Sequence, residues 1–153
     1  MQTTPFSSFK ALEPLMDRLH DQRFDADTVS HDQETRQWTA RFLRRDYDST
    51  RTVRQRTGLF RSRCFFPVVE TTLVVKNVTA VREGIYRNAR SDTFIGCEAT
   101  PSGFRLRCAL FIDIELDTDG PIIGEVRERD LERRGYVDTF LGAKRILRLE
   151  GLE

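Results

Sequence analysis

His20 and Asp21 are neighbouring side chains that could move a proton. A carboxylate that accepts one ring proton of a histidine orients the imidazole, and such a pair serves as a general base near neutral pH. The alternative role is structural, because a histidine at the end of a helix interacts favourably with the negative end of the helix dipole. His20 and Asp21 are therefore candidate catalytic residues of an enzyme whose other site residues come from distant parts of the chain.

The segment 41–63 is rich in arginine and could bind anions. It carries eight arginines against two aspartates, a local net charge of +6. Guanidinium groups bind phosphate and carboxylate in a bidentate manner, and nearby aromatic rings could stack on bases. An acidic protein surface fits equally well. The alternative is a solvated loop whose charge is balanced by the acidic N- and C-terminal segments. The candidate binding residues are Arg41, Arg44, Arg45, Arg51, Arg54, Arg56, Arg61 and Arg63, with the aromatic residues Phe60, Phe65 and Phe66.

Other chemistries lack their motifs. The chain contains no HExxH, no EF-hand spacing, no CxxC pair, no GxSxG and neither of the two glycine-rich phosphate loops. The cysteines Cys64, Cys97 and Cys108 stand apart from one another, and Cys97 and Cys108 fall on alternating stretches. We expect all three to be reduced, buried thiols. The sequence predicts no metal ion and no cofactor.

The opening of the chain resembles a known group of proteins. Leu19-His20-Asp21 precedes an alternating strand, a polar turn and a second strand from Trp38 to Leu43. This order is similar to the start of small β-rich domains among bacterial immunity proteins, and it covers about the first 45 residues. The resemblance implies a protein that binds and blocks a toxin partner and is not an enzyme. It assigns no functional residue.

The elements that must position these residues begin with a helix. Residues 6–19 contain apolar side chains at helical spacing. Pro14 belongs in the first turn of a helix, so the regular helix is expected to begin near Glu13. After Asp21 the apolar period changes to two, which predicts a hairpin with a polar loop at 31–35. Further strands are predicted at 59–69, 71–81 and 93–99.

The most regular pattern in the chain lies between Phe104 and Leu116. Every second residue is apolar over this stretch, which predicts one long strand with a continuously buried face. The connection Pro101-Ser102-Gly103 predicts a hairpin that joins it to 93–99. In that hairpin Glu98 is expected to meet Arg105 or Arg107 across the strands.

The fold class predicted from these elements is α+β. The charged stretch 125–134, followed by Gly135, predicts a C-terminal helical element. We expect a single domain, 1–153, with a mainly antiparallel twisted sheet of about six or seven strands and an N-terminal helix. The strand from Phe104 to Leu116 is expected at its centre. The predicted core contains Trp38, Phe42, Val74, Leu106, Leu110 and Ile112.

Composition limits the compartment and the partners. The chain has 153 residues, with 25 basic and 24 acidic side chains, so it has no global field that would steer a polyanion. No apolar run is long enough to span a bilayer, and the start shows no secretory signal. We therefore expect a cytoplasmic bacterial protein with no membrane partner. Only Lys10, Lys76 and Lys144 are lysines, a bias explained either by a GC-rich genome or by anion binding.

Three functional hypotheses remain open. The first is a non-catalytic binding protein, immunity-like, that acts on a protein partner. The second is a nucleic-acid or nucleotide-binding module that uses segment 41–63. The third is an enzyme built around His20 and Asp21. A homodimer is also compatible with the sequence, because a long strand at a sheet edge could pair with its copy.

Overall fold

The computed structural model describes residues 1–47, 49–140 and 145–152, the last range as backbone only. The chain divides into two compact units: Met1–Arg44 with Glu70–Arg129, and Arg45–Val69 with Asp130–Glu153. The long strands β5 and β8 contribute residues to both. The elements are β1 (Gln2–Phe6), α1 (Phe9–Asp17), β2 (Arg23–Asp32), β3 (Gln37–Arg45), β4 (Val53–Arg56), β5 (Arg61–Ile85), β6 (Ser91–Thr100), β7 (Gly103–Cys108), β8 (Ile112–Phe140) and β9 (Arg145–Leu152).

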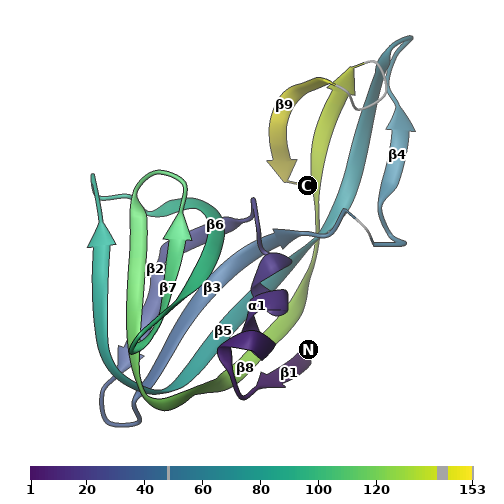
Figure 1. Cartoon of the computed structure of the whole chain (residues 1–153). Coiled ribbons are helices and arrows are strands. Elements are labelled where there is room, and N and C mark those ends of the chain that lie inside the picture. The colour runs from purple at the N-terminus through teal and green to yellow at the C-terminus, as the bar shows by residue number, and fades with distance from the viewer. Residues whose placement is uncertain (48, 141–144, 153) are drawn as a thin grey trace. The chain divides into compact units, whose positions relative to one another are not determined.

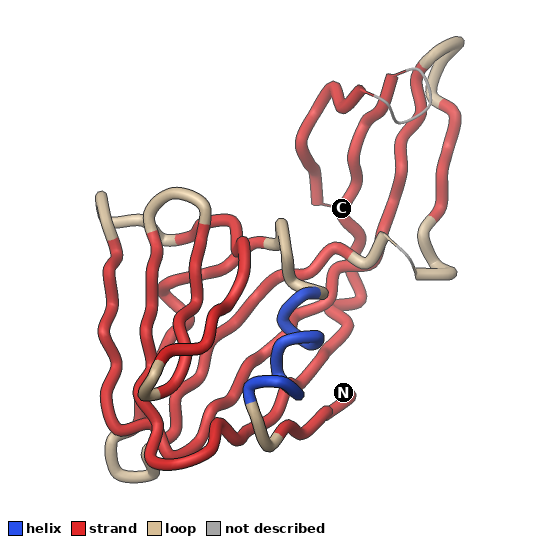
Figure 2. The backbone as a smooth tube through the Cα atoms, in the orientation of Figure 1, coloured by secondary structure: helices blue, strands red, loops and turns tan. Residues whose placement is uncertain are grey.

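The strands of the first unit form a closed circuit of paired neighbours. β8 pairs with both β7 and β5, so the order β2, β3, β5, β8, β7, β6 returns to β2 (Figures 1 and 2). The junction that closes the circuit is short, from Arg23 opposite Thr93 to Asp25 opposite Ser91, so closure covers only part of β2 and β6. β1 pairs with a further part of β8, from Gln2 opposite Glu128 to Phe6 opposite Gly124. Pro5, which lacks an N–H, is compatible with such an added edge strand.

A large aromatic and aliphatic core fills the first unit. Trp38, Phe24, Phe42, Phe94 and Phe104 have exposed fractions of 0%. The ring of Phe42 lies 4.9 Å from that of Phe24 and 5.3 Å from that of Phe94, centroid to centroid. Paired aromatic rings at such distances add to the stabilisation that burial itself provides. The core therefore draws on strands from both ends of the chain.

The short helix α1 covers part of this core. It begins at Phe9 because Ser8 caps it, accepting a hydrogen bond from the Ala11 N–H at 3.2 Å. The helix thus starts four residues before the predicted Glu13, and Pro14 lies inside it. It ends at Asp17, three residues after the proline. Leu12 and Met16 are buried on its inner face, as its apolar spacing predicted.

The second unit has a much smaller core. Its strands β4, β5, β8 and β9 pair side by side in antiparallel order. The buried residues of its described part are Phe66, Val68 and Val137, with Cys64 and Leu131 packed against them. Tyr47 covers Phe66, with ring centroids 4.6 Å apart. A cluster of this size gives far less apolar burial than the core of the first unit.

Two predicted hairpins are confirmed. β2 and β3 pair antiparallel, with Phe24 opposite Phe42. β6 and β7 pair antiparallel around the turn at 101–102, and Glu98 lies directly opposite Arg105. Their Oε1 and Nη1 atoms are 3.4 Å apart. Alternating patterns bounded by turn residues were therefore sufficient to predict these elements.

The prediction of one strand from Phe104 to Leu116 is wrong. The stretch is a hairpin, with β7 ending at Cys108 and β8 beginning at Ile112. Three residues separate the two strands, so even-numbered residues point inward in both β7 and β8. The alternation of apolar residues in the sequence therefore continues across the turn. Leu110, predicted to be core, sits in this turn and is 72% exposed. The other predicted core residues are buried: Trp38, Phe42, Val74, Leu106 and Ile112.

The predicted C-terminal helical element at 125–134 is also wrong, because these residues continue β8. Their backbone pairs with β1 at residues 124–128, a strand that the sequence pattern did not reveal. Pairing with a distant strand overrides the local helix propensity of a charged stretch. The antiparallel sheet is confirmed, but it has nine strands rather than six or seven, and α1 is the only helix among the described residues. The fold is therefore mostly β, and the predicted α+β class with a C-terminal helical element is not met. The helix α1 is too short to cross a membrane.

Candidate binding site

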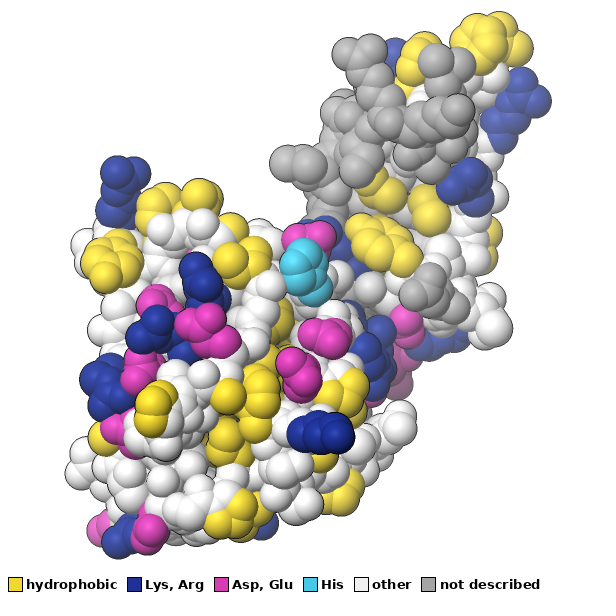
Figure 3. Space-filling view, viewed as in Figure 1, with side chains coloured by type: hydrophobic (Ala, Val, Ile, Leu, Met, Phe, Trp, Pro, Cys, Tyr) yellow, Lys and Arg dark blue, Asp and Glu magenta, His cyan; other side chains and the backbone are white. Residues whose placement is uncertain are grey.

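The tip of the β4–β5 hairpin exposes hydrophobic and basic side chains together. We call Arg54, Arg56, Leu59, Phe60 and Arg61 the hairpin tip. Leu59 is 74% exposed and Phe60 is 55% exposed. The five residues border an open hollow of about 430 Å³, and Figure 3 shows yellow and blue side chains side by side at this end of the second unit.

The three arginines of the hairpin tip have no carboxylate within ion-pair distance among the described residues. Arg56 donates hydrogen bonds to the carbonyl oxygens of Gly58 at 3.1 Å and Leu59 at 3.2 Å. These bonds hold the guanidinium against its own turn but leave its charge uncompensated. The hairpin tip therefore presents positive charge around an apolar centre.

The structure distributes the eight candidate arginines instead of gathering them. Arg41 and Arg44 belong to the first unit, where they pair with Glu70 and Glu128, each at 3.3 Å. Arg51 pairs with Asp130 in the second unit. Arg45 is also engaged. Asp48, one of the two aspartates of this segment, lies outside the described residues. Three of the eight arginines remain at the hairpin tip.

Within the second unit the arginines also divide between two faces of the sheet. Arg54 is opposite Cys64 and Arg56 is opposite Ser62, so both share the face of the small core. Arg63 alternates with Cys64 and therefore lies on the opposite face. Phe66 is 1% exposed, so this predicted stacking residue is not accessible.

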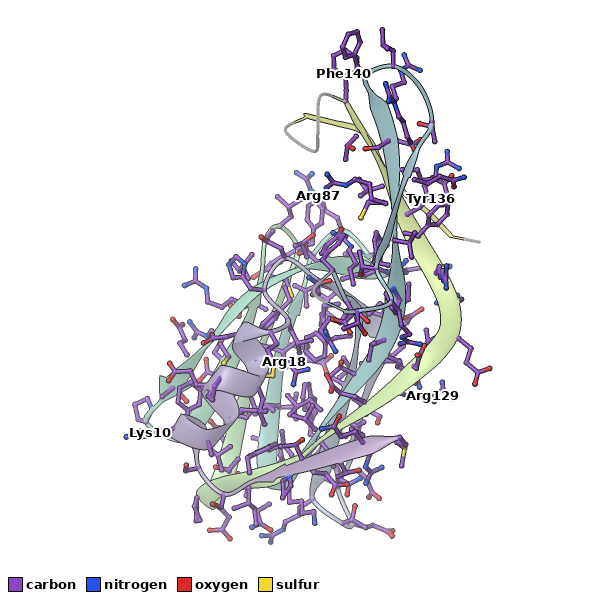
Figure 4. All side chains as sticks on the ribbon, turned by 90° about the vertical axis from the view of Figure 1, so that its right-hand side faces the viewer. Lys10, Arg18, Arg87, Arg129, Tyr136 and Phe140 are labelled. Atoms are coloured by element: carbon purple, nitrogen blue, oxygen red, sulfur yellow. The ribbon has the colours of Figure 1, made fainter. Side chains whose placement is uncertain are left out.

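The face that holds Arg63 is lined by aromatic rings. The guanidinium carbon of Arg63 lies 4.1 Å from the ring centroid of Tyr136, a cation–π contact. Phe65 lies 6.1 Å from Tyr136, and Phe60 lies 6.2 Å from Phe140, between centroids. Figure 4 marks Tyr136 and Phe140 along β8, with Phe140 nearer the end of the unit. Asp138 accepts two hydrogen bonds from Arg63, at 2.7 and 3.1 Å, and balances its charge.

His20 and Asp21 lie together on an exposed turn after α1. Nδ1 of His20 is 3.3 Å from Oδ2 of Asp21, and the side chains are 59% and 74% exposed. Asp21 has a φ of 62°, which fits a tight turn at the helix end. Neither residue lines the hollow at the hairpin tip. An open pair of this kind offers a substrate no enclosed surface, whereas catalytic pockets usually bury most of their ligand.

A second hollow, of about 500 Å³, lies beside the β2–β3 turn of the first unit. His31, Gln33, Arg36 and Thr79 supply its polar lining. Nε2 of His31 is buried without a hydrogen-bond partner, while Arg36 pairs with Asp119 at 3.3 Å. No sequence motif indicated His31 as a site residue, because its position in a strand gave no signal that its Nε2 would be enclosed.

The cysteines have the character of structural thiols. All three are free and partly buried. Burial raises the pKa of Cys97 to about 12 and that of Cys108 to about 12, with nearby carboxylates adding to the effect. A thiol with so high a pKa is a poor nucleophile near neutral pH. Among the described residues, no group of three His, Cys, Asp or Glu side chains could hold a metal ion.

Comparison of the chain with family models, with curated proteins and with solved structures yields no match. The site must therefore be interpreted from its own chemistry. The arginine count of segment 41–63 located the hairpin tip, and Phe60 was part of that prediction. Leu59 was missed because one leucine beside a turn has no pattern of its own. Tyr136 and Phe140 were missed as face residues because the stretch before them was predicted to be helical.

Proposed function

We propose that this chain is a non-catalytic binding protein that docks a protein partner through the hairpin tip. The observation that carries the proposal is the exposure of Leu59 and Phe60 between three arginines that pair with no carboxylate of the described residues. Arginine and aromatic residues are the types that contribute most to protein interfaces. The partner would offer an apolar pocket bordered by aspartate or glutamate side chains.

Leu59 favours a protein partner over a nucleic acid. Burying apolar surface contributes about 25 cal/mol per Å², so an exposed leucine gains from a pocket lined by other apolar side chains. A phosphate backbone offers no such pocket, and bases stack best on aromatic rings. Phe60 suits either partner, whereas its neighbour Leu59 favours a protein.

Charge supports an acidic partner. The second unit contains 11 basic and seven acidic residues, a net charge of +4, whereas the first unit has a net charge of −3. Complementary charge raises the association rate and selects against partners of the wrong sign. The arginines of the hairpin tip lie where such a partner would make its first contact.

The resemblance of the opening to bacterial immunity proteins supports the same class of function. Those proteins bind and block a toxin partner. The resembling residues, through Leu43, belong to the first unit, and the hairpin tip belongs to the second. The resemblance therefore supports non-catalytic binding and does not specify the hairpin tip as the contact.

The experiment is affinity capture with the purified chain from bacterial extract, read by quantitative mass spectrometry. Leu59→Ser combined with Phe60→Ser should abolish retention of the partner while leaving thermal unfolding unchanged. The control is Leu110→Ser combined with Tyr86→Ser, a pair in the first unit with exposed fractions of 72% and 63%. Equal retention by the tip variant and the wild-type chain would refute the proposal.

A second candidate function is binding of single-stranded nucleic acid on the aromatic face of the second unit. The specific observation is the arrangement of Arg63 and Tyr136 beside Phe65, since bases stack on such side chains. The test is the affinity for a generic single-stranded oligonucleotide at two salt concentrations. Binding that falls steeply with salt and is lost in Tyr136→Ala would favour this function. Oligonucleotide binding that is unchanged in Tyr136→Ala would count against this second function.

A further inference from the structure

We propose that β4 accepts an additional strand from an acidic segment of the partner, so that part of the recognition is made by backbone hydrogen bonds. This inference rests on the proposed function and names the form of its ligand. Among the described strands, β4 stands at one end of the strand order and pairs with β5 alone. All four of its residues, from Val53 to Arg56, are exposed. An unpaired edge of this kind is a template for another strand.

The phase of the hydrogen bonds shows which residues face the free edge. The Thr57 N–H donates to the carbonyl oxygen of Arg61 at 3.0 Å, which makes these two a hydrogen-bonded pair. Hydrogen-bonded and non-bonded pairs alternate along antiparallel strands. Arg56 opposite Ser62 is then a non-bonded pair, and so is Arg54 opposite Cys64. The N–H and C=O groups of Arg54 and Arg56 therefore point away from β5, toward the open edge.

The two residues that offer their backbone are also the two cations of the strand. Arg54 and Arg56 lie on one face, two residues apart. A strand added along this edge would place its hydrogen-bonded residues directly opposite them. Opposite charges in directly facing positions stabilise a strand pair, and like charges destabilise it. The edge therefore selects a segment with acidic residues at alternate positions, in the register that pairs one acid with each arginine.

The same charges argue against a second copy of this chain as the occupant. In a two-fold antiparallel pair of β4 strands, Arg54 would face Arg54 or Arg56 of the copy. Each of these registers sets two guanidinium groups opposite each other without a carboxylate. In the first unit, the added strand β1 carries Pro5, which cannot donate a backbone hydrogen bond to a further strand.

The experiment uses the full chain and the blocked peptide acetyl-TEVEVT-amide, followed by amide NMR shifts. We expect the largest shifts at the amides of Arg54 and Arg56, together with slower hydrogen exchange there. N-methylation of the two glutamate nitrogens should weaken binding about tenfold or more, because the hydrogen bonds that these two N–H groups donate to the carbonyl oxygens of the edge are lost. N-methylation of the two valine nitrogens, which would face solvent, should leave binding unchanged.

Charge reversal completes the test. Arg54→Glu combined with Arg56→Glu should lose the acidic peptide and bind the basic peptide acetyl-TKVKVT-amide instead. Lys10→Glu combined with Arg90→Glu makes the same net change in the first unit and should have no effect. Acidic peptide binding that is indifferent to glutamate N-methylation, or no shifts with millimolar peptide, would overturn strand addition. Either result leaves the proposed function to its own test with Leu59 and Phe60, so the two can fail separately.

Discussion

The two units of this chain differ in the pairing of their edge strands, in the size of their cores and in the sign of their net charge. The first unit closes its strands into a circuit around a large aromatic core and carries a net charge of −3. The second unit leaves β4 open, buries three residues in its described part and carries a net charge of +4. Closed, well-packed elements supply stability, whereas open edges and exposed apolar groups supply recognition. The proposed function therefore places stability in the first unit and binding in the second.

The ion pairing of individual arginines differs between the two units in the same way. Arg82 of the first unit donates hydrogen bonds to Asp117 at 2.6 and 2.8 Å and to Glu115 at 2.5 Å. These contacts raise the pKa of Arg82 and lower the pKa values of both carboxyls. Basic and acidic side chains alternate on this unit in Figure 3. The arginines of the hairpin tip have no such partners among the described residues, and the proposed function assigns their charge to a ligand.

The largest expected effect comes from removing the central ring of each core. Phe42→Ala should lower the free energy of unfolding of the first unit by about 3–5 kcal/mol, because Phe42 is fully buried between two other rings. Phe66→Ala should release the β4 and β9 backbone amides while the first unit stays folded. Hydrogen exchange measured by mass spectrometry resolves the two units.

An equal effect of Phe66→Ala and Phe42→Ala on the first unit would contradict the comparison of the two units. If Phe66→Ala unfolded the first unit as completely as Phe42→Ala does, the two units would be one cooperative structure and the assignment of stability to the first would fail. If Phe66→Ala removes protection from hydrogen exchange only in residues 53–66 and 130–152, the two units unfold separately, as the comparison requires.

Local sequence patterns predicted the paired arms of β2 and β3 and of β6 and β7, because each arm alternates and each turn has its own residues. They failed where the deciding partner is remote. β8 looks helical near Arg129 until β1 is known to lie beside it. The turn around Leu110 was invisible because it preserves the parity of the apolar residues. Alternation specifies which face a residue occupies, but it does not show where one strand ends and the next begins.

The second prediction compares two glycines of β8. A Cβ atom at Gly124 would overlap the carbonyl oxygen of Val74, which is backbone of β5 and has little freedom to move. A Cβ atom at Gly135 would overlap the ring of Phe66, a side chain that can shift more easily than strand backbone. Gly124→Ala should therefore cost about 1–3 kcal/mol or more, and Gly135→Ala clearly less. Denaturant unfolding of both variants measures the difference, and an equal loss would contradict the rigidity argued for the first unit.

The third prediction concerns Asp92, whose carboxylate fastens the β7–β8 turn. It accepts hydrogen bonds from the N–H groups of Leu110 at 2.9 Å, Phe111 at 2.6 Å and Ile112 at 3.2 Å. Partial burial acts to raise the pKa of Asp92, but these donors and the N–H of Thr93 outweigh it, so the pKa lies below its ordinary value of 3.8. A depressed pKa gives stability that is present above 3.8 and is lost as the pH falls through the folded-state value.

Asp92→Asn should cost about 1 kcal/mol at pH 7, an amount reduced by the partial exposure of the group. The difference between wild type and variant should shrink in acid, below the ordinary pKa of an aspartate. Thermal unfolding of both proteins across this pH range measures it. A difference that stays constant down to strong acid would show that the carboxylate charge has no part in holding the turn.

The candidate site was predictable in part, for physical reasons. An excess of arginine over acid within a short segment is visible in the sequence, and it marked the region that holds the hairpin tip. Which arginines are neutralised is not visible, because their acidic partners are distant: Glu128 for Arg44, Asp130 for Arg51 and Asp138 for Arg63. Exposure of Leu59 likewise depends on a turn that the described elements leave uncovered.

The smallest expected effect compares an arginine from each unit. Arg82→Gln should lower the melting temperature at low salt and have little effect at high salt, because exposed ion pairs are screened. Arg54→Gln should leave the melting temperature unchanged at both salt concentrations, because Arg54 forms no ion pair with any described residue. Calorimetry of the two variants, with wild type as reference, distinguishes them. Destabilisation by Arg54→Gln equal to that by Arg82→Gln would mean that the arginines of the hairpin tip stabilise the fold. A stabilising role would then explain these arginines, and their presence would no longer support the proposed binding of a partner.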